Sequence, residues 1–361
     1  MKGLDRIGLC GGLAAAACVC LVIFLGSRGF KHFDLALTHY AAAIVFAAFA
    51  VSYRYVVWLQ RPPTKRYWVR GWLLFFRRPL ANSLYLIRAL VDSFATQRFI
   101  SRRSPIRWLM HFCLSWGVMI AFAITFPLVF GWMHFEMESA APNYRIFVLG
   151  YPTNEFSIDS VFGFLLFNGL NISGVLVLIG VVLAVQLRLQ EPAKLALQKF
   201  GNDIAPLLIL FLVATTGLGL TVSARWLGGH GYSFIALAHA AVVIGFLLYL
   251  PFGKFFHIFQ RTAQLGVAFY KRAGKEGLQA VCARCQQPFA SAMQVADLKI
   301  VEQELGIDYR MSGAVDHYQQ ICPACRRRLV ALNQGRLLGR EVANFDFVVS
   351  SSDPQKISSA D

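Results

Sequence analysis

The sequence predicts an all-α integral membrane protein, a bundle of six transmembrane helices followed by a small cytoplasmic metal-binding tail. Hydrophobic residues make up 57% of the 361 residues and charged residues only 15%. Six stretches are long and apolar enough to cross a bilayer, which takes about 20 residues. Two CxxC pairs lie in the polar C-terminal part. This composition is typical of a membrane protein rather than of a soluble domain.

The first two apolar stretches form an N-terminal helix pair within residues 1–60, and the other four form a membrane core within residues 109–260. The first stretch resembles a signal peptide, but no clear small-x-small cleavage site follows it before a soluble domain. We therefore expect it to remain as the first helix. The predicted spans are approximately 7–27, 35–59, 109–133, 160–187, 204–226 and 233–258.

Positive charge is concentrated in alternate connections between the spans. The connection 61–108 holds eleven Lys and Arg residues and a single acid, Asp92, whereas 134–159 holds four acids and only Arg145. The positive-inside rule places the basic connections on the cytoplasmic side of a bacterial inner membrane, with both termini on that side. The formal charge of +16 is thereby explained by the lipid bilayer, without a nucleic-acid partner.

The connection 61–108 contains the stretch WLLFFRRPLANSLYLIRALVDSF, which mixes aromatic and basic residues. Such a stretch can lie in the membrane interface as an amphipathic helix. It can equally serve as the docking surface for a partner subunit. The sequence favours neither alternative.

Four histidines, His39, His111, His239 and His257, lie within or at the ends of predicted spans, where ionisable side chains are functional candidates. Eighteen residues separate His239 from His257, which is five turns of a continuous helix and about 27 Å of rise. One helix would thus present an imidazole near each side of the membrane. Depth pairs His111 with His257 at the inner side and His39 with His239 at the outer side, with His134 as the rival of His39.

Two bis-histidine haems would use four such imidazoles, because haem iron takes axial histidines. The alternative for any single histidine is an ordinary hydrogen bond between helices. Pro251, which precedes His257, is expected to bend the last span because proline removes a backbone hydrogen bond.

The run LPFGKFFHIFQR, with a histidine 18 residues upstream of its own, resembles the last haem-binding helix of the respiratory nitrate reductase gamma-subunit family. The same superfamily includes heterodisulfide-reductase-type membrane cytochromes b. The segment RWLMHFCLSWGVMIAF is similar to that family's other haem helix, and the resemblance covers approximately residues 105–260.

The resemblance implies a cytochrome with two haems b that exchanges electrons between a quinone, menaquinone or ubiquinone, and a peripheral redox subunit. That subunit would carry an iron–sulfur, flavin or molybdenum centre in the cytoplasm. By position, His111 and His257 would share the inner haem, and His239 would hold the outer one. Where the family has a second histidine on the first haem helix, this chain has Ala121, so the outer haem would draw on His39 or be absent.

The four tail cysteines, Cys282, Cys285, Cys322 and Cys325, form CARC and CPAC motifs 36 residues apart. Two such pairs make a tetrahedral thiolate site for structural zinc or a single iron. Gln286 and Arg326 stand where rubredoxin-type knuckles carry glycine, which favours zinc, and a disulfide or redox-active dithiol is the third alternative. We expect a zinc-ribbon-like domain over 276–348 that docks a partner, and a disordered tail over 349–361.

The favoured function is therefore an electron-transfer subunit of a membrane quinone oxidoreductase complex. No catalytic carboxylates or nucleophile are evident in the sequence, which leaves open whether the chain is itself an enzyme. A six-helix transporter is the second class, although inverted repeats and mid-membrane acids are not evident. A non-redox membrane anchor that recruits a partner through the zinc tail is the third.

Overall fold

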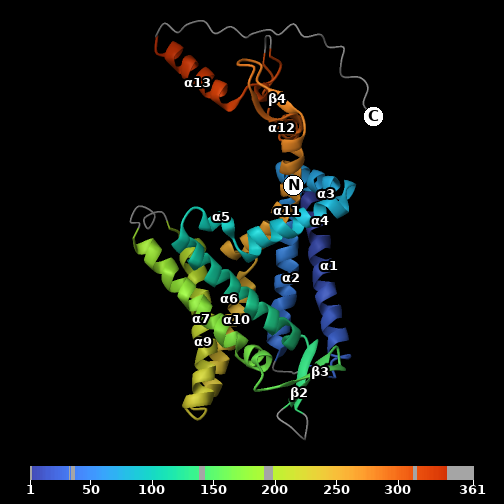
Figure 1. Cartoon of the computed structure of the whole chain (residues 1–361), viewed down its shortest axis with the longest axis vertical. Coiled ribbons are helices and arrows are strands. Elements are labelled where there is room, and N and C mark those ends of the chain that lie inside the picture. Colours follow the sequence, from blue (N-terminus) through green and yellow to red (C-terminus); the bar gives the residue numbers. More distant parts are fainter. Residues whose placement is uncertain are drawn as a thin grey trace. The chain divides into compact units, whose positions relative to one another are not determined.

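The computed structural model describes the chain except for residues 1, 32, 34–36, 138–142, 191–197, 312–314 and 340–361. The predicted disordered tail 349–361 lies outside the described residues. The chain forms two compact units (Figure 1). The first unit comprises Met1–Trp58 with Leu86–Thr262, and the second comprises Leu59–Tyr85 with Ala263–Asp361.

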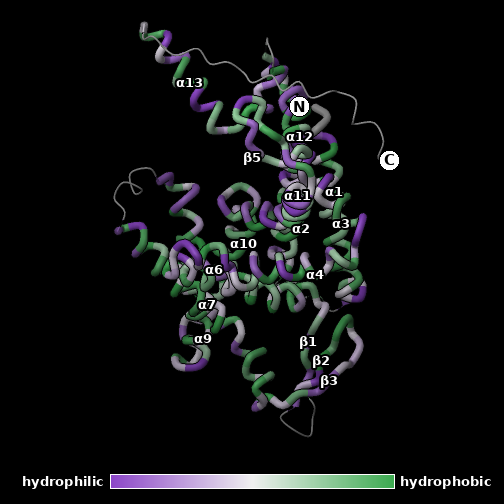
Figure 2. Tube along the Cα trace, turned by 45° about the horizontal axis from the view of Figure 1, so that its top comes forward, coloured by the Kyte–Doolittle hydropathy of each residue, from purple (hydrophilic) through white to green (hydrophobic). Residues whose placement is uncertain are grey.

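Six helices, one in each predicted span, are long and apolar enough to cross a membrane. Figure 2 shows that apolar residues dominate these helices. The chain is therefore a multi-pass membrane protein. The helices are α1 (Lys2–Gly26), α2 (Thr38–Leu59), α6 (Pro105–Val129), α7 (Val161–Leu189), α9 (Ala205–Trp226) and α10 (Tyr232–Tyr249).

Glycines bring the first-unit helices close together. On α1, a Cβ at Gly8 would lie 2.5 Å from Val57, and one at Gly12 would lie 2.9 Å from Phe49. The two helices therefore run antiparallel in contact. Between α6 and α7, a Cβ at Gly117 would lie 2.9 Å from the carbonyl oxygen of Ser173. Small residues at such contacts let backbones approach, which is how transmembrane helices associate without a hydrophobic driving force.

A three-stranded antiparallel sheet, which was not predicted, connects α6 to α7. Its strands are β1 (Met133–Met137), β2 (Asn143–Val148) and β3 (Tyr151–Ser157), in the order β1-β2-β3. Leu149 and Gly150 join β2 to β3 with φ angles of 51° and 78°. Positive φ at both positions matches the right-handed twist of a tight hairpin. Strands this short have no helical periodicity or apolar length by which the sequence could indicate them.

The predicted continuous helix over 233–258 is wrong. Helix α10 ends at Tyr249, a single 3-10 turn, η4, covers Lys254–Phe256, and α11 begins at His257 and runs to Glu276. Pro251 has no N–H to donate to the carbonyl of Leu247, and its ring would clash with that carbonyl, so α10 does not continue through it. His239 and His257 therefore do not lie on one face of a single helix. Their relative position depends on the tertiary fold.

The predicted basic connection 61–108 forms several elements. They are α3 (Pro62–Arg77), α4 (Pro79–Leu90), the π-helical turn η2 (Val91–Ala95) and the short α5 (Arg98–Ser101). Exposed apolar side chains follow one another along α3 and α4 at helical spacing, which suits either a membrane interface or a partner. They are Val69, Leu73, Phe76, Leu80 and Leu84.

In the second unit, α3 and α11 cross at two glycines. A Cβ at Gly71 would lie 1.9 Å from the carbonyl oxygen of Gly266, so a side chain here would push the helices apart. The rings of Trp72 and Phe75 pack against Phe269 of α11, with centroids 6.0 and 5.0 Å away. The remaining elements are β4 (Gln279–Val281), β5 (Pro288–Ser291), α12 (Ala292–Glu304), η5 (Tyr318–Gln320) and α13 (Pro323–Leu337).

A buried carboxylate joins α12 to these crossing helices. The side chain of Asp297 is fully buried, and it accepts hydrogen bonds from Arg70 at 2.5 Å and from the Tyr270 hydroxyl at 2.7 Å. Arg66 lies 3.6 Å away. Burial and this carboxylate raise the pKa of Tyr270, so the phenol stays protonated and donates. A buried charge needs such partners to offset its desolvation.

Candidate functional site

His111, near the start of α6, is half-buried and held by Gln97. Gln97 Nε2 points to the carbonyl oxygen of Phe94 at 3.4 Å and also donates to Ser115, so its Oε1 faces the imidazole. The distance from His111 Nδ1 to that oxygen is 2.8 Å. Nδ1 must therefore carry the proton and donate. The lone pair then lies on Nε2, the nitrogen that is free to bind a metal.

The turn that carries Gln97 is fixed on α6 by two tryptophans. Trp108 Nε1 donates to the carbonyl of Thr96 at 2.8 Å, and Trp116 Nε1 donates to the carbonyl of Ala95 at 2.9 Å. Gln97 itself is 3% exposed and has a left-handed φ of 52°. A non-glycine residue in that region costs about 1–3 kcal/mol and persists only where its surroundings hold it there. The strained backbone aims the carboxamide at the imidazole.

His257, the first residue of α11, is oriented by the backbone of the helix break. Its Nδ1 lies 2.5 Å from the carbonyl oxygen of Lys254, an atom that can only accept. Nδ1 is again the protonated nitrogen, and Nε2 holds the lone pair. The break between α10 and α11 thus supplies the acceptor, the Lys254 carbonyl, that sets the tautomer of His257.

The fold brings His111 and His257 together. Each lies within electrostatic range of Arg261, and His257 lies within such range of His111, although 146 positions separate the two in the sequence. The predicted inner pair is therefore a spatial neighbourhood of two half-buried imidazoles with free Nε2 atoms. Neutral imidazoles that donate Nδ1–H to an oxygen are the usual form of a metal-binding histidine, so each of these residues can offer Nε2 to a metal.

His239, on α10, repeats the pattern. The Thr216 hydroxyl donates to the carbonyl of Leu212 at 2.6 Å, so its oxygen accepts from His239 Nδ1 at 2.9 Å. Gly217 lies beside the ring, where an added Cβ would come within 3.2 Å of the imidazole Cε1. The third imidazole thus also keeps Nε2 for a ligand. In the described part of the chain, no protein hydrogen bond reaches Nε2 of His111, His239 or His257.

The two candidates for the remaining outer ligand differ from these three. His39 lies in the first turn of α2 and is exposed, and its ring has no hydrogen bond to any described residue. His134 lies on β1, stacks on Phe147 with centroids 4.9 Å apart, and points Nε2 at Glu136 at 3.4 Å. Among the described residues, the His39 ring therefore has no acceptor that fixes it through Nδ1.

The four tail cysteines converge on one point. Their sulfur atoms all lie within 4.8 Å of one another, and Cys285 Sγ is 3.8 Å from Cys322 Sγ. All four are free thiols, so the disulfide alternative is not seen here. Tetrahedral Zn–S bonds of about 2.3 Å put sulfur atoms at such separations. The cluster can therefore hold a metal ion such as zinc or iron.

Backbone groups tie the two CxxC turns together. The Cys322 N–H donates to Cys282 Sγ at 3.2 Å, and the Ala283 N–H donates to the carbonyl of Gln320 at 3.0 Å. Burial opposes ionisation of the Cys282 thiol, but N–H donors from Cys322, Cys285 and Arg284 outweigh it and lower its pKa to about 6. Burial and the neighbouring sulfurs raise the pKa of Cys325 to about 12. The Cys282 thiolate thus forms readily, whereas Cys325 needs a bound cation to ionise near neutral pH.

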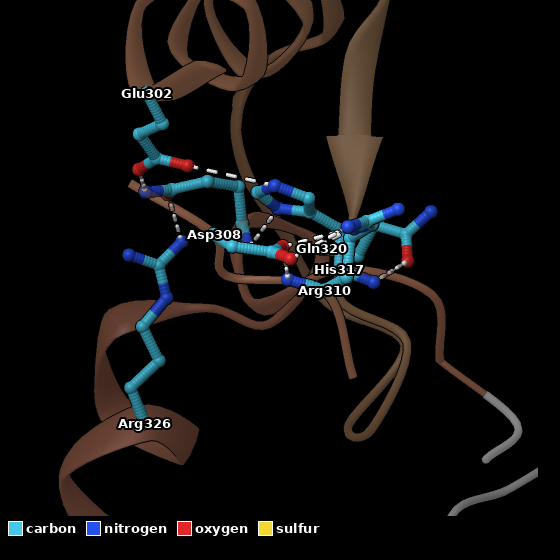
Figure 3. Close-up of polar contacts among 7 residues, drawn as sticks. Glu302, Asp308, Arg310, His317, Gln320 and Arg326 are labelled. Atoms are coloured by element: carbon cyan, nitrogen blue, oxygen red, sulfur yellow. Dashed lines mark hydrogen bonds and ion pairs between the residues drawn. The ribbon is translucent and has the colours of Figure 1, made fainter. Parts of the chain in front are cut away.

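A polar network beside the cluster fixes the second CxxC turn to α12 (Figure 3). Arg326, next to Cys325, donates to the carbonyl of Ile321 at 2.7 Å and to Gln319 Oε1 at 2.5 Å. Gln319 donates in turn to Glu302, whose other oxygen lies 3.6 Å from His317 Nε2. These contacts fix the second CxxC turn against α12.

No protein-family model, no curated protein and no solved structure matches this chain. Its function must therefore be inferred from the site itself.

Proposed function

We propose that this chain is a membrane b-type cytochrome subunit that passes electrons between the quinone pool and a cytoplasmic redox partner. The observation that supports it best is the shared state of three imidazoles. His111, His239 and His257 each donate Nδ1–H to a fixed oxygen, and each leaves Nε2 without a described protein partner. Satisfied core histidines use both nitrogens, whereas axial ligands keep one for iron.

The inner haem would lie between His111 and His257, which approach from α6 and α11. When bound, this haem would supply one-electron transfer. The chain would supply two ligands with fixed tautomers, through Gln97 and the Lys254 carbonyl. His239 would hold the second haem, with His39 as the predicted partner ligand and His134 as its rival.

The tail is proposed as a zinc-bound docking domain. Zinc is preferred over a single iron because Gln286 and Arg326 follow the two CxxC pairs. Metal binding would contribute folding free energy to a unit whose own core is small. Cytoplasmic placement of this unit and of both termini, in a bacterial inner membrane, follows from the basic connections.

The test is a reduced-minus-oxidised visible spectrum of the purified full-length protein, with haem extracted and counted per chain. We expect a b-type α-band and two haems. One haem would retain the inner site and remove the outer one from the proposal. A protein that binds no haem would contradict the proposal and favour a membrane anchor or a transporter.

A further inference from the structure

Arg261 is a half-buried cation next to the two inner imidazoles. It lies one turn after His257 on α11, and residues four apart share a helix face. Its guanidinium carbon is 5.0 Å from the centroid of the Phe99 ring, which belongs to α5, next to the turn that holds Gln97. The guanidinium also lies within electrostatic range of both imidazoles.

No carboxylate in the described ranges lies within ion-pair distance of Arg261. The neighbouring cation differs, because Lys254 Nζ lies 2.8 Å from Asp203 Oδ1. Burial lowers the pKa of Arg261, but an arginine remains charged in proteins. A half-buried guanidinium that packs on the Phe99 ring thus lies near two imidazoles and has no carboxylate partner among the described residues. An anion bound there would offset the desolvation of the charge.

We propose that Arg261 binds a carboxylate side arm of the haem that His111 and His257 ligate. This inference rests on the proposed function. Haem carries two propionates, and a guanidinium fork binds a carboxylate with two parallel hydrogen bonds. Phe99 packs against the guanidinium on one side, and no described carboxylate occupies its N–H groups.

A lipid phosphate offers the same oxyanion chemistry, because α11 follows the last span closely. The two sources differ in their effect on the iron. A carboxylate joined to the porphyrin places the guanidinium charge in permanent contact with the redox centre, whereas a headgroup exchanges with other lipids. The reduction equilibrium of the inner haem therefore separates them.

The first experiment is a potentiometric titration of Arg261→Gln, Arg261→Lys and Arg98→Gln in the full chain, with haem counted per chain. Arg98 is the control because its side chain is 63% exposed and lies 3.5 Å from Asp92. Removing a partly buried positive charge near iron favours the ferric state. We expect Arg261→Gln to lower the reduction equilibrium constant of the inner haem about tenfold, about 59 mV for a one-electron couple.

Arg261→Lys should recover part of that shift, because the charge remains and the fork is lost, and Arg98→Gln should leave the potential unchanged. An inner haem of unaltered potential and stoichiometry in Arg261→Gln would overturn the inference while leaving the cytochrome proposal intact. Absence of haem in the wild-type protein would instead overturn the proposed function.

The second experiment uses only the wild-type protein, so its result does not depend on whether the Arg261 variants fold. Haem-depleted wild-type protein in nanodiscs is titrated with haem and with haem dimethyl ester, whose propionates are blocked. We expect the ester to bind the inner site at least tenfold more weakly. Equal affinity for the two compounds would assign the Arg261 anion to lipid and refute the propionate contact.

Discussion

Gln97 offers the sharpest prediction about the inner site. Its buried carboxamide accepts from His111 Nδ1 at 2.8 Å, so Gln97→Glu replaces a neutral acceptor with an anionic one of nearly the same size. Hydrogen bonds to charged groups are about twice as strong as neutral ones, and a neutral one contributes about 1 kcal/mol net. The added stabilisation falls on the ferric state, because a more basic imidazole binds Fe(III) better.

An additional ~1 to 1.4 kcal/mol corresponds to about 43 to 60 mV for one electron. We therefore expect Gln97→Glu to lower the midpoint potential of the inner haem by about that amount, and Gln97→Leu to raise it or release the haem. The assay is a potentiometric titration of the α-band. Thr216→Val is the matched control, because it should act on the haem of His239 alone. A Gln97→Glu protein whose inner haem keeps its wild-type potential would refute the assigned tautomer.

The second unit gives two further predictions. Asp297→Ala leaves the buried Tyr270 hydroxyl and the partly exposed Arg70 without their acceptor, which should destabilise this unit by about 1–3 kcal/mol in a thermal melt. Asp308→Ala, at an exposed pair with Arg310, should change the melt little, and equal effects would contradict the role of Asp297. Chelation of the metal should unfold the cysteine domain, seen as loss of near-UV circular dichroism, and Cys322→Ser should do the same, so a domain unaffected by both would have no structural metal.

The six spans were predictable because uninterrupted apolar length is a strong signal that depends little on tertiary contacts. The cysteine cluster was predictable for a related reason, since each CxxC pair places two sulfurs on one tight turn. The fold then had only to bring the two turns together. The Sγ atoms of Cys285 and Cys322, one from each turn, lie 3.8 Å apart.

The end of α10 and the short sheet were harder to predict. Pro251 indicated a bend, but whether a helix bends or stops depends on what satisfies the freed backbone groups. The strands 133–157 depend on a two-residue hairpin with positive φ at Leu149, which has no sequence preference for that conformation.

The histidine environment could be predicted only in part. The depth of His111 and His257 in their predicted spans was a reason to pair them. The residues that accept the histidine Nδ1–H groups, Gln97 and Thr216, were not predicted. Gln97 lies in a basic connection with no periodic pattern, and its role depends on a left-handed backbone that two tryptophans hold. A threonine within an apolar span was the only available signal for Thr216, and such residues more often bond to their own helix, as Thr216 also does.

The most direct test of the account is low-spin EPR of His111→Ala, His257→Ala and His239→Ala, each with its haem content. If His111 and His257 share one haem, their variants lose the same low-spin signal and keep the other, while His239→Ala loses the second signal alone. Loss of different signals in His111→Ala and His257→Ala would contradict the pairing on which the site is built.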